Sequence, residues 1–368
     1  MAALSPPLGK ISKSLLAGLL AWLLISVYGS ACGAEDGVAR GDTGNKRIAF
    51  SNSYAGSDFR KVMVRNWEEV AAYAQQAGLI KEAPVVSAGN SAPEQAAHIQ
   101  NMVLEGYDAI VILAASDTAL TSVVRDACNA GTVVVILASK VNDPCVNEVN
   151  YDWSEMGRAE IEYVAERLGG KGNLLEIRGI AGDATDADIS DGIHKAAQDY
   201  PGLTIVHTVY GQWTASVAQR EVALALPSLP RIDAIVDQGG DGYGAAMAFK
   251  EAGRPLPVIV MGNRQDELAL WKQERDANGY QTFSISATPS VSQVGFWVAQ
   301  QILAGKKVVP VVTVPLVSIS EKELDGWLAT MPKGGAANPF YTQEIVAAMI
   351  DAKRSGTEPP RVPAPKTP

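Results

Sequence analysis

The sequence predicts an α/β fold made of two similar halves in tandem, each built on a parallel sheet. After residue 46, short apolar runs alternate with longer segments of helical periodicity, which is typical of βαβ units. The runs are continuously apolar, as expected of strands that are covered on both faces. The chain has 368 residues, of which 47% are hydrophobic, so it is long enough for two domains.

The first half contains four expected strands with a helix after each of the first three. Gly78, Gly106 and Gly131 follow these helices, where glycine commonly ends a helix in the left-handed conformation. The expected strands are 47–52, 83–87, 108–114 and 132–138, and the expected helices are 58–77, 93–105 and 118–130.

The second half repeats the pattern and is followed by a further helix, a further strand and a Pro-rich tail. The tail, 353–368, is expected to be disordered because it has few residues that could join a core. The expected strands are 173–178, 203–210, 232–237, 257–262, 282–287 and 311–315, and the expected helices are 189–199, 215–226, 242–252, 265–275 and 291–303.

The N-terminus has the pattern of a secretory signal peptide, which we place at residues 1–34. Lys10 and Lys13 precede an apolar run at 15–27, and small residues follow to Ala34. The run is shorter than the roughly 20 residues of a membrane span, so we expect cleavage and an exported protein. A lipid anchor through Cys32 remains the alternative.

Export gives the two remaining cysteines an oxidising environment, and we expect Cys128 and Cys145 to be bonded to each other. Such a bond closes a loop of about 17 residues, worth on the order of 3 kcal/mol in the chain-entropy model. Two free buried thiols are the alternative.

Composition disfavours several other classes of function. The net charge of −9, without clustered Lys and Arg, argues against a nucleic-acid partner. The three histidines are scattered, so no zinc site is expected, and no Gly-x-Ser-x-Gly motif occurs. We expect neither a cofactor nor catalysis.

Several short motifs occur in a fixed order between Arg47 and Pro315. They are IAFS at 48–51 with DF at 58–59, EQ at 94–95 with GYDAI at 106–110, EIRGIAG at 176–182, GQW at 211–213, IDAIVDQGGDGYGAAMAF at 232–249 and QILAGK at 301–306. In this order they resemble the type I periplasmic solute-binding proteins of ABC importers, specifically the ribose-binding-like sugar receptors.

The resemblance implies two doubly wound parallel-sheet lobes joined by a hinge of three crossings, near 151–153, 286–287 and 313. The N-terminal lobe would comprise 46–151 and 287–312, and the C-terminal lobe 152–286 and 313–345. A monomer of this kind would clamp a small polar solute, a sugar or polyol, between its lobes and deliver it to an ABC permease in the inner membrane.

A sugar site needs aromatic faces for the ring and planar polar groups for the hydroxyls. Phe59 and Trp213 lie where the family places its stacking aromatics, one in each lobe, although core packing would also explain them.

Six polar candidates share one kind of position, after the carboxyl end of an expected strand, where open parallel sheets bind ligands. Turn and cap formation is the alternative for Gln238 and Asp241, and pairing with a neighbouring carboxylate is the alternative for Arg264. The six are Asp58, Ser116, Gln238, Asp241, Asn263 and Arg264.

The chain departs from the ribose-receptor pattern at three positions. Ala138-Ser139 replaces an Asp-Arg pair, Ala114 replaces an Asn, and Ala187 replaces an Arg, so ribose itself is disfavoured; Ser139 remains a candidate. In the acidic loop 183–191 we retain Asp183, the residue nearest the strand end, with a solvated loop and helix cap as the alternative.

Two alternative functions are weighed. Gly240-x-Gly242-x-x-Ala245 follows a strand and matches a dinucleotide fingerprint, and Arg264 could meet the 2′-phosphate of NADP. This motif lies in the third unit of the second half instead of the first βα turn, which disfavours an oxidoreductase. A sensor that presents its solute to a membrane receptor shares the fold, whereas a repressor is excluded because a signal peptide stands where its helix-turn-helix would be.

Overall fold

The computed structural model describes residues 37–360 and 362, and these residues form one compact unit. The expected signal peptide, Cys32, and residues 361 and 363–368 of the expected disordered tail lie outside the described residues. No helix of the described part is long and apolar enough to cross a membrane.

The first lobe is built on a six-stranded parallel sheet with the order β11-β5-β4-β3-β1-β2. Its central strands β1 and β3 are buried at every residue, as the continuous apolar runs predict. The strands are β1 (Ile48–Asn52), β2 (Val85–Ser87), β3 (Ala109–Leu113), β4 (Val133–Leu137), β5 (Asn147–Asn150) and β11 (Val311–Thr313).

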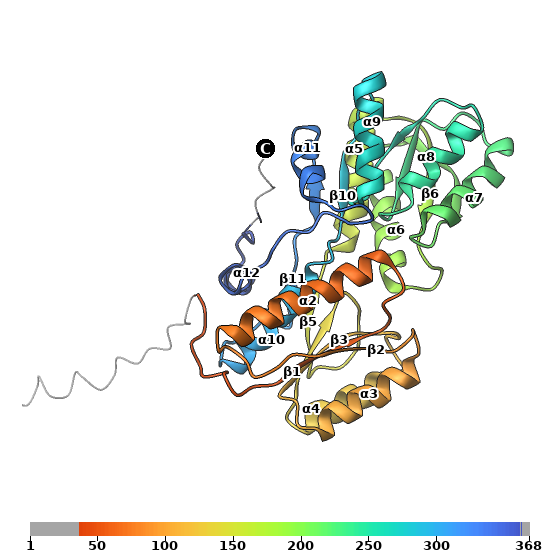
Figure 1. Cartoon of the computed structure of the whole chain (residues 1–368). Helices are drawn as coiled ribbons and strands as arrows, with labels where there is room; N and C mark the ends of the chain where they lie inside the picture. Colours follow the sequence, from red (N-terminus) through yellow and green to blue (C-terminus); the bar gives the residue numbers. More distant parts are fainter. Residues whose placement is uncertain (1–36, 361, 363–368) are drawn as a thin grey trace, which may run out of the picture. The chain divides into compact units, whose positions relative to one another are not determined.

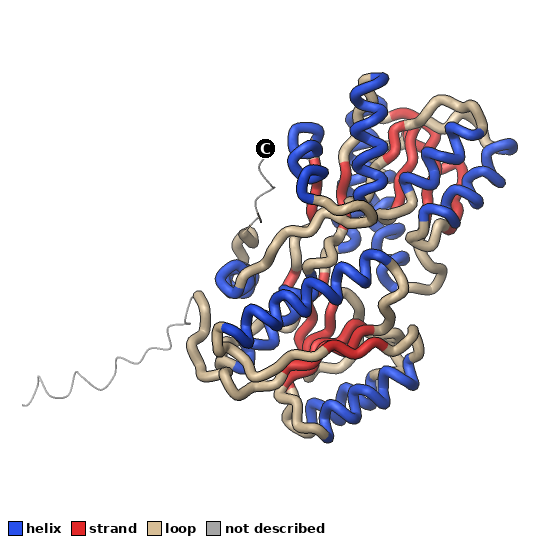
Figure 2. The backbone as a smooth tube through the Cα atoms, viewed as in Figure 1, coloured by secondary structure: helices blue, strands red, loops and turns tan. Residues whose placement is uncertain are grey.

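Helices cover both faces of this sheet (Figures 1 and 2). On one face the rings of Trp67 and Phe296 pack against Phe50 and Trp297 in a buried aromatic cluster. On the other face Ile99 and Val124 pack against the sheet. The helices are α2 (Asp58–Gln76), α10 (Val291–Leu303) and α12 (Gln343–Ser355) on the first face, and α3 (Ala92–Leu104) and α4 (Thr121–Asn129) on the second.

The second lobe has a four-stranded parallel sheet with the order β7-β6-β8-β9. A bridge between Met261 and Ser284 connects it to an antiparallel pair, β10 with β12. The strands are β6 (Lys171–Arg178), β7 (Gly202–Tyr210), β8 (Ala234–Asp237), β9 (Val258–Ile259), β10 (Ser284–Ser286) and β12 (Val317–Ile319).

The helices of the second lobe also form two layers, with separate apolar clusters on the two faces of the sheet. Helices α5 (Trp153–Leu168) and α6 (Ala184–Ala197) cover one face, and α7 (Ala215–Ala225) and α8 (Gly242–Glu251) cover the other. A short 3₁₀ helix, η1 (Leu226–Ser228), directly follows α7. Helices α9 (Gln265–Asn278) and α11 (Glu321–Thr330) pack together around Trp271 and Trp327.

The three expected crossings are present and are hydrogen-bonded to one another. Tyr151 follows β5, and Thr288 precedes α10. The Tyr151 hydroxyl donates to the Thr288 carbonyl (3.0 Å) and accepts from the Thr288 amide (3.2 Å). Val314, after β11, donates its amide to the Asn150 carbonyl (2.8 Å). These bonds hold the three connecting segments side by side as a hinge.

The chain crosses between the lobes a fourth time, which the sequence did not predict. After α11 in the second lobe, α12 returns to the first and packs on α10 and β11. The C-terminal lobe was expected to extend to residue 345, which falls inside α12. The tail was expected to be disordered from residue 353, but α12 continues to Ser355 because its apolar side is buried.

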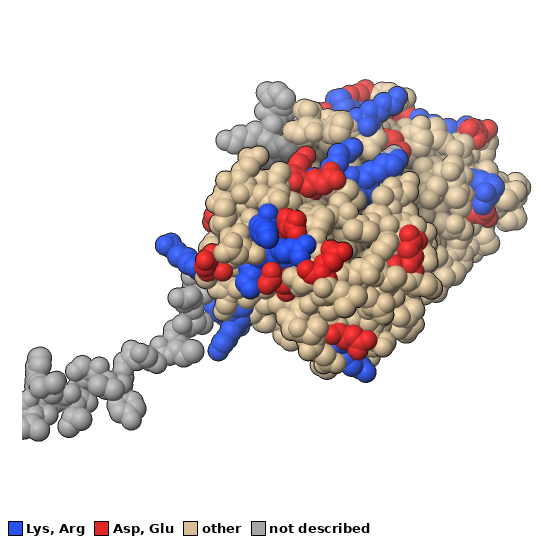
Figure 3. Space-filling view, turned by 60° about the horizontal axis from the view of Figure 1, so that its bottom comes forward, with Lys and Arg blue, Asp and Glu red and all other residues tan. Residues whose placement is uncertain are grey.

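The predicted disulfide is confirmed: Cys128 in α4 is bonded to Cys145 in the loop before β5. On the face of the molecule drawn in Figure 3, Lys and Arg are interspersed with Asp and Glu instead of forming a patch of one sign.

Candidate functional site

Segments from both lobes and from the C-terminal region surround a cavity of about 630 Å³. This volume is in the range of small-molecule sites. The first lobe contributes residues around the start of α2, and the second lobe contributes the starts of α7 and α9. The lining residues are Tyr54, Gly56, Ser57, Phe59, Val62, Trp213, Thr214, Ala215, Arg264, Gln265, Asp266 and Lys333 to Ala336.

The cavity contains both expected aromatics, Phe59 from the first lobe and Trp213 from the second. Trp213 sits on a turn in which Gln212 and Trp213 both have left-handed backbone conformations, with φ of 57° and 53°. Such conformations are costly for residues with side chains, so their presence points to a constrained, functional turn. The indole packs against Gly179, where an added Cβ would lie 2.3 Å from its Cζ2 atom.

Arg264 lines the same cavity and supports the turn that carries Trp213. Its guanidinium donates to the Trp213 carbonyl (2.8 Å) and the Gly240 carbonyl (3.3 Å). Gly240 has φ +102°, and a Cβ there would lie 2.3 Å from the guanidinium carbon, so this approach requires glycine. Arg264 thus bonds backbone carbonyls, and its expected contact with the solute stays a prediction.

Asp241 lies behind this wall, fully buried against Gly211. Its carboxylate oxygens form no hydrogen bond of standard geometry among the described residues, although the backbone amides of Trp213 and Thr214 lie close enough to favour the charged form. Burial raises the pKa of Asp241 to about 7; Arg264 opposes this shift and Glu267 adds to it. The side chain does not line the cavity, so its direct contact with a solute stays a prediction.

The chain matches the periplasmic binding protein domain over residues 48–307. It belongs to this family. A crystal structure of an ABC transporter solute binding protein from Thermobispora bispora is 34% identical, with a TM-score of 0.79, and the match covers 87% of this chain and 99% of that one.

Two curated relatives are also similar. The xylitol-binding protein of Mycolicibacterium smegmatis is 28% identical over 243 residues, which is 65% of this chain and 67% of the relative. The ribose import binding protein of Bacillus subtilis is 22% identical over 241 residues, 65% of this chain and 77% of the relative.

Two predicted site residues, Gln238 and Asp183, form hydrogen bonds within the second lobe. The Gln238 side chain accepts from the Gly179 amide (3.0 Å) and donates to the carboxylate (2.9 Å) and the carbonyl (3.0 Å) of Asp186. Asp183 caps α6 by accepting from the amides of Thr185 (2.7 Å) and Asp186 (3.3 Å). Neither lines the cavity. Asp183 performs the cap work that was its alternative, whereas Gln238 links two segments of the second lobe, and solute contact by either stays a prediction.

Asn263 lies where the crossings meet. Its amide group donates to the carbonyls of Ser286 (3.2 Å) and Val317 (2.8 Å), and its side-chain oxygen accepts from the Ser284 hydroxyl. The side chain is 2% exposed and has no free donor for a solute. Its observed contacts are those of a hinge residue.

Ser139 and Ser116 follow first-lobe strands and do not line the cavity. Ser139, after β4, accepts from the Ala114 amide (3.0 Å) and donates to the Leu137 carbonyl (3.1 Å). Ser116 accepts from the Ala119 amide (3.2 Å) in the turn before α4. Asp58 begins α2, but its side chain is not among those the structure describes.

Several charged groups near the cleft were not among the predicted site residues. Arg60 lies over the Tyr54 ring at 5.3 Å, and burial lowers its pKa. Lys140 of the first lobe pairs with Asp188 of the second at 2.7 Å, across the lobes. Arg60 directly follows Phe59 in the sequence, so its place at the helix start was a usable signal.

A buried carboxylate network supports the second-lobe wall and was also missed. Glu267 accepts from the amides of Gly240 (3.3 Å), Gly242 (3.2 Å) and Gly262 (3.1 Å). Burial raises the pKa of Glu267, and it raises the pKa of Asp237 well above its ordinary value. Glu267 and Asp237 therefore bond the backbone of the glycine-rich turn on the side away from the cavity, and neither lines the cavity.

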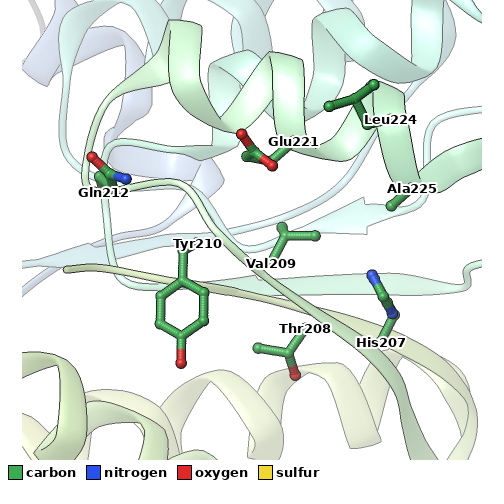
Figure 4. Close-up of a pocket in the computed structure, with 8 residues that line it drawn as sticks. All are labelled: His207, Thr208, Val209, Tyr210, Gln212, Glu221, Leu224 and Ala225. Carbon is green, nitrogen blue, oxygen red and sulfur yellow. The ribbon is translucent and has the colours of Figure 1, made fainter. Parts of the chain in front are cut away.

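A second hollow, of about 510 Å³, lies between β7 and α7 and contains none of the predicted site residues (Figure 4). Tyr210, Thr208 and His207 come from the strand, and Glu221 and Leu224 come from the helix. It is lined only by the second lobe and lacks the two aromatic walls of the first cavity. Among the described residues, no group of three or more His, Cys, Asp or Glu side chains is placed to hold a metal ion.

Proposed function

We propose that this chain is a periplasmic receptor that captures one small polar solute, a sugar or polyol, between its lobes and delivers it to an ABC permease of the inner membrane. The observation that carries the proposal is the cavity with Phe59 on one wall and Trp213 on the other. Each aromatic ring offers a face to the C–H side of a sugar or polyol. Closure of the lobes would bring both faces onto the solute at once.

The relatives support this class of solute. Their names specify xylitol and ribose, one a polyol and the other a sugar. The altered positions Ala114, Ser139 and Ala187 argue against ribose for this chain, because they remove planar hydroxyl-binding groups that the resemblance leads one to expect. We therefore place polyols ahead of ribose.

An oxidoreductase is disfavoured by the contacts of the glycine-rich turn. The amides of Gly240 and Gly242, which a dinucleotide phosphate would need, donate to the buried carboxylate of Glu267. A phosphate there would displace this carboxylate and meet its negative charge. We propose binding without catalysis.

A thermal-shift panel of pentoses, hexoses and polyols tests the binding step. A true solute stabilises the folded protein by RT ln(1 + [L]/Kd), about 2.7 kcal/mol at one hundred times Kd, and so raises the melting temperature. The panel should contain a sugar or polyol that does so, and NADPH should not. If NADPH alone stabilised the protein, the proposal would fail.

Uptake of that solute by a deletion strain tests the delivery step. We expect uptake to be lost and to return when the gene is restored. Normal uptake together with a lost chemotactic response would favour the sensory alternative.

A further inference from the structure

Residues 331–341, which we call the C-terminal strap, connect α11 in the second lobe to α12 in the first. The strap lies beyond the family match, which ends at residue 307. It nevertheless lines the cavity with residues 333–336. The fourth crossing therefore passes beside the candidate site.

The strap is fastened to the second lobe at the wall that carries Arg264. Gln265 donates its amide to the Gly335 carbonyl (2.9 Å), and Ala337 donates to the Asn263 carbonyl (2.8 Å), around an antiparallel bridge between Arg264 and Ala336. Ala337 is fully buried in the apolar cluster of α9 and α11. This end of the strap moves with the second lobe.

The strap is fastened to the first lobe by Tyr341 and Asn338. Tyr341 is buried in the first-lobe core, and its backbone bonds the side chains of Gln293 (2.9 Å) and Trp297 (3.0 Å). Asn338 and Asn66 of α2 exchange two side-chain hydrogen bonds, of 2.7 and 2.9 Å. Asn66 is 2% exposed and lies two helical turns after Phe59.

We propose that Asn66 and Asn338 are positioning residues that hold the pocket closed by linking α2 to the second-lobe wall. Ala337 is packed in the second lobe, and the next residue, Asn338, bonds Asn66 of the first lobe. Opening of the lobes would therefore stretch the Asn338–Asn66 hydrogen bonds. Ala337 and Tyr341 are buried in the two cores and Asn338 is exposed, so the amide pair opens most readily among the contacts that fasten the strap. This inference rests on the proposed function, because it takes closure of the lobes to be the step that captures the solute.

The amide pair thus sets how often the solute-free protein is closed. Because each hydrogen bond makes a modest net contribution, loss of both bonds should lower the closed-to-open ratio on the order of tenfold, which corresponds to about 1.4 kcal/mol. The change concerns the distance between the lobes and leaves the contacts within each lobe intact.

Pulsed electron paramagnetic resonance measures that distance without any solute. Nitroxide labels at Glu69→Cys on α2 and Gln273→Cys on α9, in a Cys32→Ser background, report on the first and second lobes, since both positions are exposed. We expect Asn338→Ala to lengthen the interlobe distance distribution. Asn278→Ala is the matched control, because it removes an amide that bonds Glu274 within the second lobe (2.9 Å) and should change nothing.

The buried Asn66 provides a second variant that separates a specific link from general damage. If the two side chains act as a unit, Asn66→Ala and Asn338→Ala give the same shift, and the double variant gives no more than either one. A distribution for Asn338→Ala that matches the unsubstituted protein, or shifts that add in the double variant, would overturn the inference. The readout does not depend on a solute, so failure of the proposed function would leave it interpretable.

Discussion

Replacing Asp241 by Asn should stabilise the protein increasingly as the pH rises. The carboxyl is fully buried, and burial raises its pKa to about 7, whereas an unfolded Asp has a pKa of about 3.9. The folded state therefore holds a proton that the unfolded state has released, so stability is fully present below about pH 4 and is lost as the pH rises to about 7. Asn cannot ionise and does not suffer this loss.

The magnitude follows from the two pKa values. At pH 5 the ionisable carboxyl costs about 1.5 kcal/mol relative to its fully protonated state, and at pH 8 it costs about 4 kcal/mol. The advantage of Asp241→Asn should therefore grow by roughly 2 to 3 kcal/mol between these pH values. A constant penalty from an unpaired buried amide would offset both values equally and leave the difference unchanged.

Urea unfolding at pH 5, 6, 7 and 8 measures this difference, with unfolding followed by tryptophan fluorescence and by circular dichroism. Asp191→Asn is the control, because Asp191 is an exposed residue on α6. It should alter the pH dependence by less than about 0.5 kcal/mol. An equal stability difference at pH 5 and pH 8 for Asp241→Asn would refute the assignment of a protonated buried carboxyl.

Three further predictions concern the pocket and the disulfide. Trp213→Ala should weaken binding of the solute found by the thermal-shift panel more than about tenfold, or 1.4 kcal/mol, in calorimetric titration, and an unchanged Kd would remove Trp213 from the site. Gly179→Ala should weaken binding in the same titration, because the new methyl group meets the indole at 2.3 Å; unaltered affinity and fluorescence would show that the indole is not held there. The double substitution Cys128→Ser with Cys145→Ser should lower the free energy of unfolding by on the order of 3 kcal/mol, measured by urea unfolding at a single pH. A decrease below about 0.5 kcal/mol would indicate that the disulfide constrains the unfolded chain little.

Hydrophobic periodicity was sufficient for the main architecture. The continuous apolar runs predicted both sheets, because strands covered on two faces carry a strong local signal. Strand β5 was missed because Asn147–Asn150 has only one apolar residue and is a strand through its pairing with β4 and β11. Helix α5 was also missed, although Asp152 and Gly169 cap its two ends.

The site was less predictable because strand-end position does not determine side-chain direction. Gln238 and Arg264 share that position, yet Gln238 turns inward to Asp186, whereas Arg264 borders the cavity. Asp183 caps its own helix. Lys333 reaches the cavity only through the fourth crossing, for which the local sequence gave no signal.

Native mass spectrometry of the purified protein can show whether a sugar or polyol is captured between Phe59 and Trp213. We expect one bound solute per chain, with the mass of a sugar or polyol, either after purification or on addition of the stabilising compound from the panel. The same adduct should be absent or much weaker in Trp213→Ala. A protein that carries no such adduct under either condition, or an adduct retained in full by Trp213→Ala, would contradict capture of a solute between Phe59 and Trp213.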